Sequence, residues 1–83
     1  MEDRDFLRLD DKVTVAIYGP DGNCLSKTES TGYHNLETVV KESFANSGID
    51  IDPKDCVFEI TNQTTGVTHR YRLNAHGNLK LII

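Results

Sequence analysis

The side chains in this sequence that most often bind metals or act as nucleophiles are two cysteines and three histidines. They are Cys24, Cys56, His34, His69 and His76. Zinc sites usually draw paired ligands from motifs such as Cys-x-x-Cys or His-x₃-His, and neither spacing occurs here. We therefore predict no metal site and interpret the histidines as solvent-facing or loop residues.

A cysteine beside a histidine would be a candidate nucleophile, because a neighbouring base generates the reactive thiolate. Cys56 precedes the apolar residues Val57 and Phe58, and such surroundings favour a neutral, inert thiol. A small disulfide scaffold usually carries more than two cysteines, so we interpret Cys24 and Cys56 as free, partly buried thiols. The sequence predicts a protein that is not an enzyme and that binds no cofactor.

Two further patterns have a chemical interpretation and a simpler structural one. Asp50, Asp52 and Asp55 offer the oxygen ligands that hard cations prefer, but the EF-hand spacing is absent. We interpret this segment as a solvated loop. The triplet Asn62-Gln63-Thr64 matches the N-glycosylation motif, and we interpret it as a turn.

Charge is distributed unevenly along an acidic chain. The net charge is −4, and residues 1–11 hold five acidic residues. Residues 67–83 hold Arg70, Arg72 and Lys80 and no acidic residue, so they form a basic strip. Arginine interleaved with an aromatic residue suits a nucleic acid, but an isoelectric point near 5.2 argues against one. Charges that prevent strand-on-strand aggregation are the other interpretation of these arginines.

Alternation of side-chain type predicts a β-hairpin in the first third of the chain. Lys12–Tyr18 alternates β-branched apolar residues with others, as half-buried strands do. Pro20 and Gly22 favour a type I turn followed by a left-handed residue, which gives a hairpin with a G1-type bulge. The return strand Cys24–Ser30 is rich in serine and threonine, and we place it at a sheet edge.

A helix is predicted over Asn35–Ser47, because apolar residues recur there at the spacing of one helical face. Asn35 is a good N-cap, and Gly48 suits the left-handed position after the last turn. This helix is expected to form the core with the sheet. The predicted core residues are Leu36, Val40 and Phe44 of the helix and Val15, Ile17, Phe58 and Leu81 of the strands.

Three strands are predicted after the helix, over Cys56–Ile60, Val67–Leu73 and Leu79–Ile83. The sequence thus predicts an α+β fold, a small four- to five-stranded, mostly antiparallel sheet with one helix packed on one face, in the order ββ-α-βββ. We assign residues 1–11 to a polar N-terminal arm and residues 12–83 to a single α+β domain.

The middle of the chain resembles the ubiquitin-like β-grasp family. The likeness lies in the capped helix that begins Asn35-Leu36-Glu37, the Gly48-Ile49 exit, the turn Asp52-Pro53-Lys54-Asp55 and the apolar strand at Val57-Phe58. A leading hairpin and a final Leu-x-Leu strand agree with it. The resemblance implies a non-catalytic protein-interaction module with a β-grasp-like fold.

Two features depart from that family. The sequence ends at Leu81-Ile82-Ile83 rather than at the Gly-Gly tail that conjugated members need. The last strand of a β-grasp lies parallel to the first, whereas the short link between residues 67–73 and 79–83 favours an antiparallel hairpin. The last third is therefore also similar to small bacterial proteins of uncharacterised function built from βββα repeats.

The basic strip is the predicted protein-binding site. Alternation places its outward residues on the sheet face away from the helix. These residues are Arg70, Arg72, Lys80 and Ile82. The expected partner is another protein with an acidic surface, and the alternative is a nucleic-acid-contacting accessory role for the same strands. No apolar run reaches the roughly 20 residues that span a bilayer, and the acidic N-terminus lacks a signal-like apolar region, so we expect a cytoplasmic protein without membrane contact.

Overall fold

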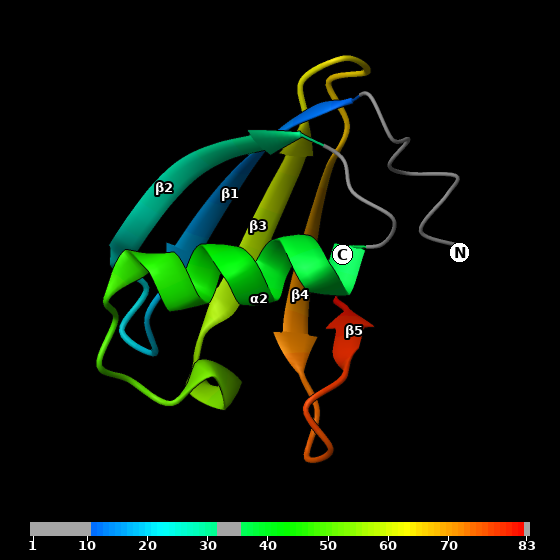
Figure 1. Cartoon of the computed structure of the whole chain (residues 1–83). Helices are drawn as coiled ribbons and strands as arrows, with labels where there is room; N and C mark the ends of the chain where they lie inside the picture. Colours follow the sequence, from blue (N-terminus) through cyan, green and yellow to red (C-terminus); the bar gives the residue numbers. More distant parts are fainter. Residues whose placement is uncertain (1–10, 32–35, 83) are drawn as a thin grey trace.

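A computed structural model describes residues 11–31 and 36–82 of the chain (Figure 1). Its elements in chain order are β1 (Lys12–Tyr18), β2 (Cys24–Thr31), α2 (Leu36–Ser47), the 3₁₀ helix η1 (Pro53–Asp55), β3 (Val57–Asn62), β4 (Thr68–Leu73) and β5 (Leu79–Leu81). The predictions for the N-terminal arm up to residue 10, His34, the Asn35 cap and Ile83 lie outside the described residues.

The strands form a five-stranded sheet in the order β2-β1-β3-β4-β5, and every pairing in it is antiparallel. An α+β fold with an antiparallel sheet is thereby confirmed, and β2 lies at an edge as predicted. β5 lies at the other edge beside β4, because the short turn between them reaches only an adjacent antiparallel position. The last three strands form a meander.

The β1–β2 hairpin turns as its sequence predicts. Gly22 has a φ of +86°, a value that glycine adopts without strain. Its N–H donates to the Gly19 carbonyl at 3.0 Å, as in a type I turn that ends in a G1-type bulge. The register shift between Ile17 and Tyr18 is a separate irregularity further along the hairpin. The Asp21 carboxylate accepts a hydrogen bond from the backbone N–H of Asn23 at 3.2 Å, which fixes the turn locally.

α2 lies across one face of the sheet, and the core is between them (Figure 1). Buried residues include Leu36, Val39 and Val40 of α2 and Val13, Val15, Ile17, Phe58 and Ile60 of the strands. Phe44 is only half-buried, and its ring meets the buried Phe58 ring edge-on at 6.2 Å between centroids. The predicted helix–sheet core is confirmed at the other predicted positions, Phe44 packs against it from a half-buried position, and one predicted position lies outside it.

That position is Leu81, which is 42% exposed although its strand alternation points it to the helix side. β5 has three residues and a neighbour on one side only, so it gives Leu81 little cover. The prediction of Leu81 as a core residue was therefore wrong.

Two polar residues expected in a turn or at the surface are buried instead. Asn62 is fully buried at the end of β3, and His69 of β4 is also buried. His69 shares the helix side of the sheet with Tyr71, whose hydroxyl lies 3.1 Å from the ring Nδ1. The interpretation of His69 as solvent-facing was wrong, because strand alternation turns its side chain inward.

Candidate functional site

The sheet face opposite α2 carries the residues predicted to bind a partner. Paired residues of neighbouring strands point to the same face, so the strand register defines rows of side chains that cross the sheet. One row contains Tyr18 and Val57, which are register partners, and Arg72 and Lys80, which are also partners. Val57 and Arg72 line the same hollow, which joins the two pairs.

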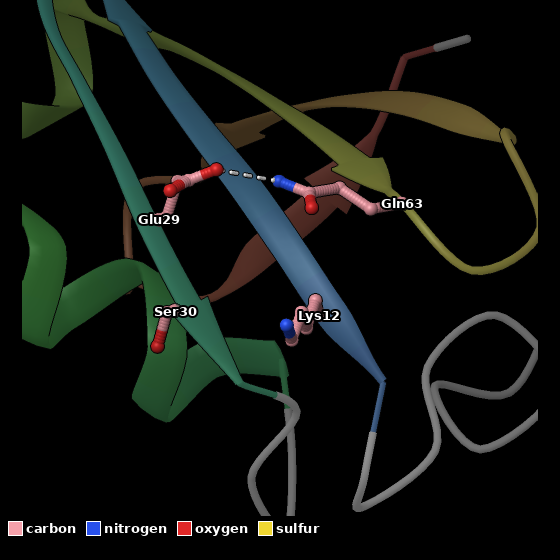
Figure 2. Close-up of a pocket in the computed structure, with 4 residues that line it drawn as sticks. All are labelled: Lys12, Glu29, Ser30 and Gln63. Carbon is pink, nitrogen blue, oxygen red and sulfur yellow. Dashed lines mark hydrogen bonds between the residues drawn. The ribbon is translucent and has the colours of Figure 1, made fainter.

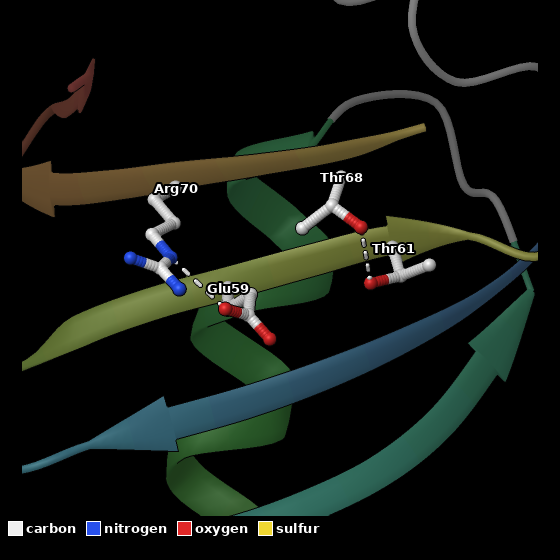
Figure 3. Close-up of polar contacts among 4 residues, drawn as sticks. All are labelled: Glu59, Thr61, Thr68 and Arg70. Carbon is white, nitrogen blue, oxygen red and sulfur yellow. Dashed lines mark hydrogen bonds and ion pairs between the residues drawn. The ribbon is translucent and has the colours of Figure 1, made fainter. Parts of the chain in front are cut away.

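The next row contains Ala16, Glu59, Arg70 and Ile82. The Arg70 guanidinium donates from Nε to Glu59 Oε2 at 2.9 Å (Figure 3). The Arg70 carbonyl accepts from the Ile82 N–H at 2.9 Å, which places the exposed Ile82 beside it. The structure thus brings together all four predicted contact residues, Arg70, Arg72, Lys80 and Ile82. We call these four, with Tyr18 and Val57, the basic face.

A hollow of about 320 Å³ lies where the hairpin turn meets the basic face. Its lining consists of Tyr18, Gly19, Pro20, Gly22, Val57, Arg70 and Arg72. The turn that forms one wall is closed by a hydrogen bond from the Gly19 N–H to the Asn23 carbonyl at 2.9 Å. The hollow therefore combines aromatic and apolar surface with two guanidinium groups.

The charges of the basic face are only partly balanced. Arg70 pairs with Glu59, but among the described residues Arg72 and Lys80 have no ion-pair partner. These two exposed cations are directly opposite one another on β4 and β5. Like charges in opposed positions repel, so an anionic group between them would relieve that repulsion.

The other end of the same face is polar and satisfied internally. The Gln63 side chain donates to Glu29 Oε2 at 3.0 Å and to Thr14 Oγ1 at 2.6 Å, beside a hollow lined by Lys12, Glu29, Ser30 and Gln63 (Figure 2). The hydroxyls of Thr61 and Thr68 bond to each other at 2.9 Å (Figure 3). The Gln63 amide and the two threonine hydroxyls therefore already have partners and offer little to a ligand.

The two cysteines differ in environment. Cys24 is exposed on the edge strand β2, so its prediction as a partly buried thiol was wrong. Cys56 is fully buried, and its thiol contacts the Asp52 carbonyl at 3.7 Å. Burial raises the pKa of the Cys56 thiol, and the carboxylates of Asp55 and Asp52 add to the rise. Cys56 is therefore held as a neutral thiol rather than an activated nucleophile.

The loop that contains Asp50, Asp52 and Asp55 stabilises local structure in the described part of the chain. Asp52 accepts a hydrogen bond from the Lys54 N–H at 2.9 Å and caps η1.

His76 is exposed in the β4–β5 turn. Residues 11–31 and 36–82 contain no group of three His, Cys, Asp or Glu side chains arranged to hold a metal ion. Neither described helix has the length and apolar character to cross a membrane.

Sequence reasoning did not include Tyr18 and Glu59 in the site. The even-numbered positions of Lys12–Tyr18 face away from Val13, Val15 and Ile17. This alternation placed Tyr18 on the open face, which is the sheet face opposite α2. Its neighbours on that face depend on which strand pairs with β1, and local pattern does not supply that information.

Comparisons with models of protein families, with curated proteins and with solved structures found no match to this chain.

Proposed function

We propose that this protein is a non-catalytic interaction module that binds the acidic surface of another protein through its basic face. The observation that carries the proposal is the opposed pair Arg72 and Lys80, two exposed cations without an ion-pair partner among the described residues. Two opposed like charges cost stability, and an acidic side chain from a partner offsets that cost.

Apolar surface beside the cations supports a protein as the partner. Ile82 is 46% exposed next to Arg70, and Tyr18 and Val57 line the hollow. Interfaces commonly combine an aromatic or aliphatic centre with arginine and a polar rim. The basic face has these components within two adjacent rows of the sheet.

The likeness to ubiquitin-like domains supports the same proposal at the level of element order. A hairpin, a helix and three strands follow one another, with the helix on one sheet face. The antiparallel edge position of β5 differs from the parallel pairing of a β-grasp. The proposal therefore depends on the surface residues and not on membership of that family.

The test is the double charge reversal Arg70→Glu and Arg72→Glu. Proteins retained by the wild-type chain at low salt are tested for binding by surface plasmon resonance to wild-type and variant chains. Electrostatic steering acts mainly on association, so we predict an association rate at least about tenfold lower at low salt. The difference should shrink as salt rises, since exposed charges are screened.

The matched control is Lys41→Glu with Lys54→Glu. Both lysines are exposed, on α2 and η1, and the change in net charge is the same. Equal loss of binding in the two double variants would show that total charge, not the basic face, controls binding. Loss in the control alone would place the interface on the helix side and contradict the proposal.

A nucleic acid is the alternative ligand of the same residues. Tyr18 in one row with Arg72 and Lys80 provides an aromatic ring beside cations, an arrangement that single-stranded nucleic acids bind. A fluorescent single-stranded oligonucleotide tested with the same variants distinguishes the two. Tight oligonucleotide binding that is lost on Arg70→Glu/Arg72→Glu, without any protein partner, would replace our proposal with this one.

A further inference from the structure

The outer edge of β2 is open among the described residues. β2 pairs with β1 on one side, and no described strand lies on its other side (Figure 1). The strand has eight residues, which is long for an uncovered edge, and an open edge is a template for pairing with another strand.

The hydrogen-bond pattern shows which backbone groups of β2 point outward. The Lys12 carbonyl accepts from the Gln63 N–H at 2.8 Å, so Lys12 and alternate residues of β1 direct their backbone groups toward β3. The intervening residues, including Val15, direct theirs toward β2. Thr28, the partner of Val15, therefore bonds inward, and its neighbours Lys27 and Glu29 direct their N–H and C=O groups to the open edge.

The side chains around Thr28 are complementary to themselves when the strand is reversed. The sequence reads Ser26-Lys27-Thr28-Glu29-Ser30. An antiparallel copy with Thr28 opposite Thr28 puts each Lys27 opposite a Glu29 and each Ser26 opposite a Ser30. The Lys27 and Glu29 positions are then the hydrogen-bonded pairs, since their backbone groups point outward. Backbone and charge thus favour the same register.

We propose that β2 pairs with β2 of a second copy of this chain, around a two-fold axis at Thr28. The contact is isologous, so it closes at two chains and leaves no open end for further growth. Lys27 and Glu29 lie on the open face, as their register partners Ala16 and Thr14 show. In the dimer, the open faces of the two copies therefore lie on the same side of one continuous sheet. This inference is independent of the proposed partner binding.

The opposite edge of the sheet fits a second copy less well. β5 has three residues, so it offers fewer outward backbone groups than β2. Pairing β5 with β2 of another copy would be a heterologous contact, which propagates into a filament unless its rotation closes a ring. A closed pair through β2 avoids this outcome.

The experiment is sedimentation equilibrium of the full chain and of three charge variants. Lys27→Glu places like charges opposite each other twice per dimer, and so does Glu29→Lys. Each should raise the dimer dissociation constant at least about tenfold, since two attractive pairs become repulsive. The double variant Lys27→Glu/Glu29→Lys restores opposite charges and should dimerise like the wild type.

Mixing the two single variants gives a second test. One chain then carries two acidic residues at these positions and the other two lysines, so a heterodimer should form where neither variant dimerises alone. Hydrogen exchange supplies an independent readout: the amides of Lys27 and Glu29 should become protected with rising concentration, while the Thr28 amide is protected throughout. Thermal unfolding of each variant verifies that it is folded.

A wild-type chain that stays monomeric at millimolar concentration would overturn the proposal. So would a dimer whose dissociation constant is unchanged by both single reversals, because its interface would then lie elsewhere, as at β5. Protection of β5 amides in place of Lys27 and Glu29 would have the same meaning.

Discussion

Asn62 is a fully buried polar side chain that connects the β3–β4 turn to the start of β1. Its Nδ2 donates to Asp11 Oδ2 at 2.8 Å, and its Oδ1 accepts from the Thr64 N–H at 2.9 Å. We predict that Asn62→Asp destabilises the protein strongly. The change keeps an oxygen facing Thr64 but replaces the donor with a second carboxylate facing Asp11.

The magnitude follows from two contributions. A hydrogen bond to a charged group contributes about 1.5–3 kcal/mol, and this one is lost. Two carboxylates near 4 Å repel by up to about 4 kcal/mol at an effective dielectric constant of 20, and the half-buried Asp11 experiences part of that. We expect a loss of about 3–5 kcal/mol at pH 7, from a total that is typically about 5–15 kcal/mol.

Urea unfolding monitored by circular dichroism at neutral and acidic pH measures the effect. The destabilisation should shrink as pH falls through the carboxylate range, because protonation of one carboxyl restores a donor between the two groups. The double variant Asn62→Asp/Asp11→Asn exchanges donor and acceptor, so it should recover at least about 2 kcal/mol relative to Asn62→Asp alone.

Two results would refute this reasoning. One is an Asn62→Asp variant that unfolds at the wild-type urea concentration at pH 7, since the contact to Asp11 would then contribute nothing. The other is a double variant no more stable than Asn62→Asp, since the two side chains would then act independently.

Because the Asn62 side chain is fully buried, a glycan on Asn62 is incompatible with the folded chain.

Two further predictions concern the core and the thiols. Phe58→Ala should cost about 3–5 kcal/mol, because the ring is fully buried, and Phe44→Ala roughly half as much, because it is half-buried; equal melting temperatures for the two variants would contradict this ranking. A thiol reagent should modify the exposed Cys24 at once and the buried Cys56 only on unfolding. The pKa of Cys56 is raised in the fold, so its contribution to the free energy of unfolding should be constant below about pH 8.5 and fall as pH rises above it. Cys56→Ala should remove this part of the slope of unfolding free energy against pH. An unchanged slope in Cys56→Ala would refute the assignment.

The elements of this fold follow from local sequence. Alternation defines Lys12–Tyr18 as a strand, Pro20 and Gly22 define its turn, and a 3.6-residue apolar period defines the helix that ends before Gly48. These signals act between residues close in the chain, so a single sequence contains them. The edge position of β2 was also predictable, because an exposed edge tolerates serine and threonine.

Tertiary structure alone decided which strands are neighbours and which side chains lie opposite one another. Alternation gave the face of Arg72, but only the register of β4 with β5 places it opposite Lys80. The buried Asn62 amide finds its acceptor in Asp11, which lies far away in sequence. The exposure of Leu81 depends on the place of β5 in the sheet. Side-chain alternation along a strand specifies the sheet face of each residue, but it does not specify which residue of the next strand lies beside it. The rows of the basic face therefore exist only once the sheet is assembled.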